Sequence, residues 1–89
     1  MNLSEAMNTY DIALFTIKNK GFDLELEFSD DKEEIVWWMA KKDGVTVSAH
    51  SPLSLLALVD IAERYGGNWN RMETGGLYDH LLDQENAWP

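Results

Sequence analysis

The chain contains no cysteine, and only two histidines and two prolines occur among its 89 residues. Without cysteine there are neither disulfides nor thiolate metal ligands, which disfavours a small oxidised secreted scaffold. Basic residues are also scarce. The chain has seven of them and sixteen acidic residues, which gives a formal net charge of −9. Such a charge repels nucleic-acid backbones and anionic membranes. We therefore expect no nucleic-acid partner and no membrane partner.

Long apolar runs are absent as well. Even a run such as Leu55 to Val59 is far short of the roughly 20 residues that cross a bilayer. Residues 1–20 carry acidic side chains early and lysines late, the reverse of a signal peptide. We therefore expect a cytoplasmic protein. A chain of this length also predicts one domain, covering residues 1–89.

Two changes of hydrophobic period define the expected elements. Apolar residues at alternating spacings of four and three predict a helix over residues 3–19, with Asn2 or Ser4 as cap and Gly21 as the terminating residue. Alternation with period two then predicts a strand over 22–28, and two further strands are expected over 34–42, where both faces are apolar, and over 45–49. Asp43-Gly44 favours a type I′ hairpin turn between the last two strands.

A second helix is predicted over residues 52–65. Ser51 can cap its start, Pro52 suits the first helical position, and Gly66-Gly67 ends it. This helix is apolar nearly all round, so we expect it to be covered on more than one side. Trp69 should pack back on it. A short helical segment around residues 77–82 should cover either this helix or the outer sheet face.

The predicted fold is therefore α+β: a two-layer sandwich in the order αβββα, with a three-stranded antiparallel meander and a short C-terminal helical segment. This element order resembles that of the double-stranded RNA-binding domain. Members of that family place a lysine-rich run at the start of their second helix, where this chain reads Ser51-Pro52-Leu53-Ser54-Leu55. The resemblance is one of order, and nucleic-acid binding ranks third among the functional hypotheses, ahead of enzymatic activity.

The hairpin predicts which side chains share a face, because a two-residue or a four-residue loop preserves the parity of the pairing. The helix-covered inner face should collect Val36, Trp38, Ala40, Val45, Val47 and Ala49. The outer face should collect Ile35, Trp37, Met39, Lys41, Thr46, Ser48 and His50. A three-residue loop would reverse one strand, so the assignment depends on the turn.

The main functional hypothesis is a small acidic, non-enzymatic interaction protein that binds a basic protein or itself through the outer face. Aromatic and methionine side chains inside a charged rim are typical of an interface centre. The residues of this predicted interface are Ile35, Trp37, Met39, Asp23, Glu25, Glu27 and His50. Two alternatives stay open. The C-terminal segment could bury Trp37 and Met39, and the acidic side chains could serve to discourage sheet-to-sheet aggregation.

The alternative function is a small-molecule binding module. Its pocket would lie between the outer sheet face and the C-terminal segment, lined by Trp37, Met39, Trp69 and Tyr78. We expect no catalytic residues, because His50 and His80 are far apart and no glycine-flanked nucleophile turn is present. The acidic residues around His80 offer too few convergent ligands for a metal, and no cofactor is expected.

Overall fold

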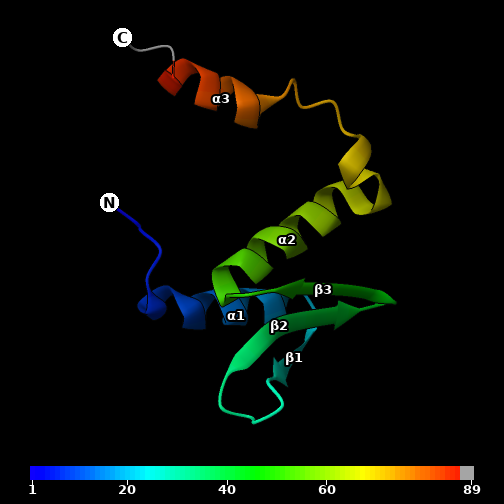
Figure 1. The fold of residues 1–89 in the computed structure, drawn as a ribbon. Helices are drawn as coiled ribbons and strands as arrows, with labels where there is room; N and C mark the ends of the chain where they lie inside the picture. Colours follow the sequence, from blue (N-terminus) through cyan, green and yellow to red (C-terminus); the bar gives the residue numbers. More distant parts are fainter. Residues whose placement is uncertain (87–89) are drawn as a thin grey trace.

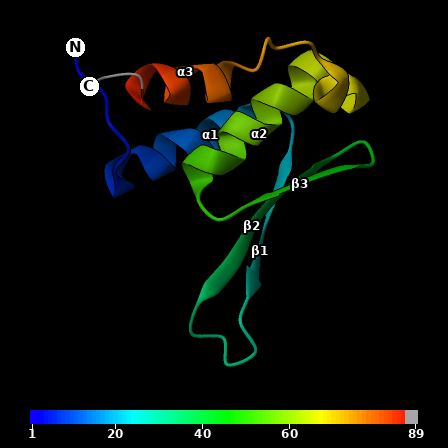
Figure 2. The same ribbon diagram turned by 45° about the horizontal axis from the view of Figure 1, so that its top comes forward.

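The computed structural model describes residues 1–86, which leaves Trp88 outside the described part of the chain. Three strands, β1 (Asp23–Phe28), β2 (Ile35–Lys42) and β3 (Val45–Ala49), form one antiparallel sheet in the order β1-β2-β3. The helices α1 (Tyr10–Asn19) and α2 (Pro52–Tyr65) lie on the same side of this sheet (Figures 1 and 2). A 3-10 segment, η2 (Gly66–Arg71), and a third helix, α3 (Leu77–Asn86), follow. The predicted α+β class is confirmed.

The turn at Asp43-Gly44 confirms the predicted hairpin. Both residues have positive φ, 48° and 81°, as a type I′ turn requires. The register pairs Ala40 with Val47 and Trp38 with Ala49, which are the pairs expected for a two-residue loop. The residues of β2 and β3 that share a face are therefore the ones predicted.

The second helix also has the predicted bounds, because its local signals agree. The Ser54 backbone N–H donates to the Ser51 hydroxyl at 3.2 Å, and Pro52 occupies the first turn. Gly66 then leaves the helical conformation at φ 57°. The Ser51 hydroxyl satisfies a backbone N–H that the helix start would otherwise leave unpaired, and Pro52 has no N–H to satisfy.

The first helix begins later than predicted. A 3-10 turn at Met7–Thr9 precedes α1, and the Thr9 hydroxyl donates to the carbonyl oxygen of Ala6. Leu3 and Met7 are about 80% exposed, at 79% and 80%, so their apolar side chains have no core to join. Periodicity alone does not stabilise a helix without a surface on which to pack. The end at Asn19 is confirmed, with Gly21 at φ 90°.

The core lies between the sheet and the two helices. Ile17, Leu55 and Val59 are completely buried there. They pack with smaller residues of β2 and β3 and with Phe22, and Leu24 of β1 and Trp38 lie against the cluster. The buried members are Ile17, Phe22, Ala40, Val47, Ala49, Leu55 and Val59. Lys42 ties the hairpin to α1, because its Nζ donates to the Lys20 carbonyl oxygen at 2.7 Å and lies 5.4 Å from the centre of the Phe22 ring.

Candidate functional site

The outer face of the sheet alternates acidic and apolar side chains across β1 and β2. The register places Glu25 opposite Met39 and Glu27 opposite Trp37. Cross-strand partners share a face, and Trp38, one residue from both Trp37 and Met39, points into the core. All four side chains therefore lie on the face away from α1 and α2. We call Glu25, Glu27, Trp37, Met39 and His50 the outer sheet patch.

Trp37 is held in place by a stacked neighbour. The rings of Trp37 and His50 lie 4.2 Å apart at their centroids with an interplanar angle of 24°. His50 itself is anchored, since its Nδ1 lies 3.2 Å from the Val36 carbonyl oxygen. Trp37 and Met39 are half-buried and His50 is exposed. The patch thus offers an ordered aromatic side chain to a partner, which reduces the entropy lost on binding.

The carboxylates of the patch differ in their neighbours. Lys41 Nζ lies 2.8 Å from Glu25, and Lys18 Nζ lies 3.7 Å from Asp23 at the near end of β1. In both pairs the side chains are largely exposed, between 44% and 84%, so the pairs contribute little to stability. Within residues 1–86, Glu27 forms no ion pair. The face therefore keeps a net negative charge beside Trp37.

Ile35 does not join this patch, although the sequence predicted that it would. The pairing shifts between Glu27 and Phe28, so that Glu27 faces Trp37 but Phe28 faces Ile35. The extra residue, Val36, forms a β-bulge that reverses the alternation. Ile35 shares a side with Phe28, where the β1–β2 ends extend past the helices (Figure 2), and both are exposed, at 41% and 49%.

The described part of the C-terminal segment, up to residue 86, leaves the outer face open. In Figures 1 and 2, α3 lies on the helix side of the molecule, with α2 between it and the sheet. Its apolar side chains are themselves exposed: Leu77 61%, Tyr78 76%, Leu81 59% and Leu82 46%. Burial of Trp37 beneath this segment, one of the two alternatives to an interface, does not occur in the structure.

The four residues of the predicted small-molecule pocket are not brought together. Trp37 and Met39 lie on the outer face, whereas Trp69 lies in η2 on the helix side and Tyr78 lies in α3. The reason is that α2 crosses the inner face and carries η2 with it. Trp69 does lie against α2 as predicted, beside Leu58 and Ala62, but it remains 60% exposed.

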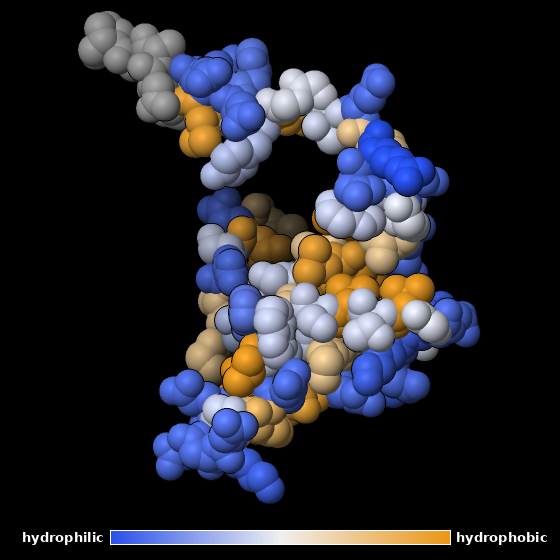
Figure 3. Space-filling view, turned by 45° about the vertical axis from the view of Figure 1, so that its right-hand side comes forward, coloured by the Kyte–Doolittle hydropathy of each residue, from blue (hydrophilic) through white to orange (hydrophobic). Residues whose placement is uncertain are grey.

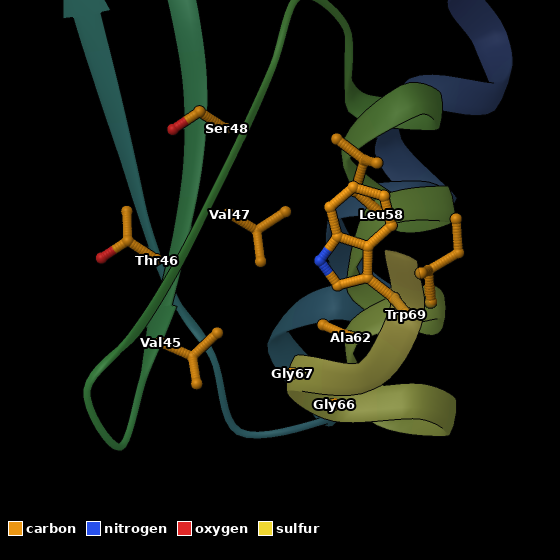
Figure 4. Close-up of a pocket in the computed structure, with 10 residues that line it drawn as sticks. Val45, Thr46, Val47, Ser48, Leu58, Ala62, Gly66, Gly67 and Trp69 are labelled. Atoms are coloured by element: carbon orange, nitrogen blue, oxygen red, sulfur yellow. The ribbon is translucent and has the colours of Figure 1, made fainter. Parts of the chain in front are cut away.

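A different cavity, of about 510 Å³, lies where β3, α2 and η2 meet. Val45 and Val47 point into it from β3, and Leu58, Ala62 and Trp69 form the opposite wall (Figure 4). The face that includes the ends of α2 and β3 carries a band of apolar side chains between hydrophilic ends (Figure 3). The sheet and α1 cover α2 on two sides, as expected, but Leu58 and Ile61 beside the cavity stay exposed, at 40% and 37%.

The acidic turn between β1 and β2 is ordered by its own hydrogen bonds. The Ser29 hydroxyl donates to the Asp31 carboxylate, which also accepts the Glu33 backbone N–H at 3.0 Å. Both hydrogen bonds lower the pKa of Asp31 below its ordinary value, and the bond from Ser29 has the larger effect. Among residues 1–86, no group of three or more His, Asp or Glu side chains is arranged to hold a metal ion.

Sequence reasoning missed the bulge at Val36 and the cavity beside β3. The bulge has no clear signal in a run of six apolar residues. The cavity did have a sequence signal, because Leu58 and Ile61 give α2 more apolar surface than a single sheet face can cover. Within the described chain, no helix is long and apolar enough to cross a membrane. Comparisons with protein-family models, curated proteins and solved structures found no match for this chain.

Proposed function

We propose that this chain is a non-enzymatic interaction protein that binds a basic protein through the outer sheet patch. The observation that carries the proposal is the register, which sets Glu25 beside Met39 and Glu27 beside Trp37 on a face that no helix of residues 1–86 covers. An apolar centre within a rim of one charge combines the desolvated contact that gives affinity with the field that selects and steers the partner.

The sign of the charge supports a foreign partner over self-association. Two copies meeting through this patch would bring their carboxylates together, and like charges placed across an interface cost several kcal/mol. A partner rich in lysine or arginine would instead pair with Glu25 and Glu27 and gain from the net charge of −9. The same reasoning disfavours a nucleic-acid partner. Because the chain lacks cysteine, a reducing compartment suits it, and we place its action in the cytoplasm.

Site-specific photo-crosslinking tests this proposal. A photoreactive phenylalanine analogue at Met39, expressed in the cells that make the protein, should trap a protein of net positive charge. Trp37→Glu in the same chain should abolish the crosslink, because it removes the aromatic contact and buries a carboxylate. Raising the salt concentration in the lysate should weaken capture, since the rim acts electrostatically.

The matched control carries the analogue at Ser54, an exposed residue on the first turn of α2. Crosslinks to the same protein from both positions, or capture of an acidic protein from Met39, would contradict the proposal. Circular dichroism of Trp37→Glu must show an intact fold, so that lost capture reports the surface and not unfolding.

A further inference from the structure

We propose a second binding site: the cavity beside β3 receives an extended, basic peptide segment that pairs with the free edge of β3 as a fourth strand. This site is distinct from the outer sheet patch, because it uses the free edge of β3 and the cavity on its helix side. The contact is backbone pairing. It rests on three features that meet at one place: an unpaired strand edge, an apolar cavity next to it, and the charge of the surrounding face.

The strand edge follows from the register. β3 pairs only with β2 in the sheet of the described residues. In a two-residue type I′ hairpin the residues that flank the loop, here Lys42 and Val45, exchange hydrogen bonds, and bonded and non-bonded pairs then alternate. Thr46 pairs with Lys41, and Ser48 pairs with Met39, at the non-bonded positions. Their backbone N–H and C=O groups therefore point away from the sheet.

The cavity lies along this same edge. Thr46 and Ser48 line it, although Figure 4 shows that their side chains point away from the opposite wall. Their contribution to the lining is therefore the backbone. Val45 and Val47 point toward Leu58 and Trp69 across the gap (Figure 4). Backbone donors and acceptors beside an apolar cavity are what an added strand requires, because the main chain pairs with the edge and alternate side chains enter the pocket.

Charge favours a basic segment. No lining residue carries a charged side chain, so the side chains that enter the cavity should be apolar. Those that alternate with them would join the outer face beyond Thr46 and Ser48. Glu25 and Glu27 lie on β1, three strands away from the added strand, roughly 14 Å at the usual strand spacing. A lysine or arginine side chain of the added strand would extend toward these carboxylates over the outer face, and the formal net charge of −9 attracts a basic segment.

The direct test uses a short capped peptide of alternating valine and lysine as the probe. Backbone resonances of ¹⁵N-labelled protein should shift most at Thr46 and Ser48, together with the Trp69 indole. In the free protein the Thr46 and Ser48 amides should exchange quickly with solvent while the Val47 amide is protected. Saturating peptide should slow exchange at Thr46 and Ser48 as well. The absence of saturable shifts at these amides would overturn the proposal.

Two pairs of controls isolate the backbone contact. The same peptide N-methylated at alternate residues, so that its donors on one edge are lost, keeps every charge and should bind at least about fivefold more weakly, as expected for a lost hydrogen bond. Thr46→Pro should have a similar effect, whereas Thr46→Val keeps the N–H and should bind as the wild type does. Equal binding of the methylated and unmethylated peptides would mean general attraction of a cation and would overturn strand addition.

A third variant keeps the test decisive if Thr46→Pro does not fold. Leu58→Lys places a charge on the cavity wall at a side chain that is 40% exposed, so the helix can accommodate it. This substitution should weaken peptide binding at least about fivefold. Trp37→Glu alters only the outer sheet patch and should leave the exchange pattern at Thr46 unchanged. Loss of peptide binding in Trp37→Glu but not in Leu58→Lys would place the peptide on the outer face and refute this site.

Discussion

Replacing each member of the tryptophan pair with alanine should have very different effects on stability. Trp38 packs against the core cluster, and truncating a large core aromatic costs about 3 to 5 kcal/mol. Because Trp38 is not fully buried, we expect a loss of about 3 kcal/mol. Trp37 is half-buried on the outer face, where its stacking on His50 contributes about 1 kcal/mol. The expected loss for Trp37→Ala is about 1 to 2 kcal/mol.

Urea denaturation followed by far-ultraviolet circular dichroism measures this difference, because the signal does not depend on the tryptophan that was removed. Equal m-values in the two variants would show that the midpoints report stability alone. In a domain of this size, 1 kcal/mol corresponds to about 4 to 8 °C in Tm, so thermal melts provide a check. Equal losses, or a larger loss in Trp37→Ala, would refute the assignment of the two faces.

Three further predictions concern the turn, the hairpin and α3. Asp31→Asn should lower Tm at neutral pH but not in strong acid: the depressed pKa of Asp31 stabilises the fold above the ordinary pKa, and this contribution is lost as pH falls through the folded-state value. Thermal melts between strong acid and neutral pH measure this change, and Asp30→Asn should lower Tm by less than Asp31→Asn does. Lys42→Met should cost about 1 to 2 kcal/mol in urea, because it leaves the Lys20 carbonyl oxygen without its donor; no loss would contradict that contact. Ending the chain at Glu73 should change the free energy of unfolding by less than about 1 kcal/mol, because the apolar side chains of α3 are exposed, and a large loss would mean that α3 packs on the body in solution.

The sequence predicted those parts of the fold whose signals are local. Ser51, Pro52 and Gly66 each favour the observed backbone for a separate physical reason, and so the bounds of α2 were predicted correctly. Asp43-Gly44 determined the loop length, and the loop length determined which residues of β2 and β3 share a face. These signals act over a few residues and do not depend on the rest of the chain.

The errors arose where distant contacts decide the outcome. The helix predicted from Leu3 begins at Tyr10, because Leu3 and Met7 stay 79% and 80% exposed and bury no surface that would stabilise the first turns. Ile35 left the predicted patch because the bulge at Val36 is a property of the pairing between β1 and β2. The cavity beside Trp69 depends on the angle at which η2 leaves α2, and hydrophobic periodicity carries no information about such an angle.

Sedimentation equilibrium from low to high micromolar concentration tests most directly whether the outer sheet patch is available to another protein. We expect a monomer for the wild type and for Trp37→Glu, because the carboxylates of two facing patches repel each other. A wild-type dimer that Trp37→Glu dissociates would show that the chain uses this face for itself, and would contradict the proposal that a basic partner binds there.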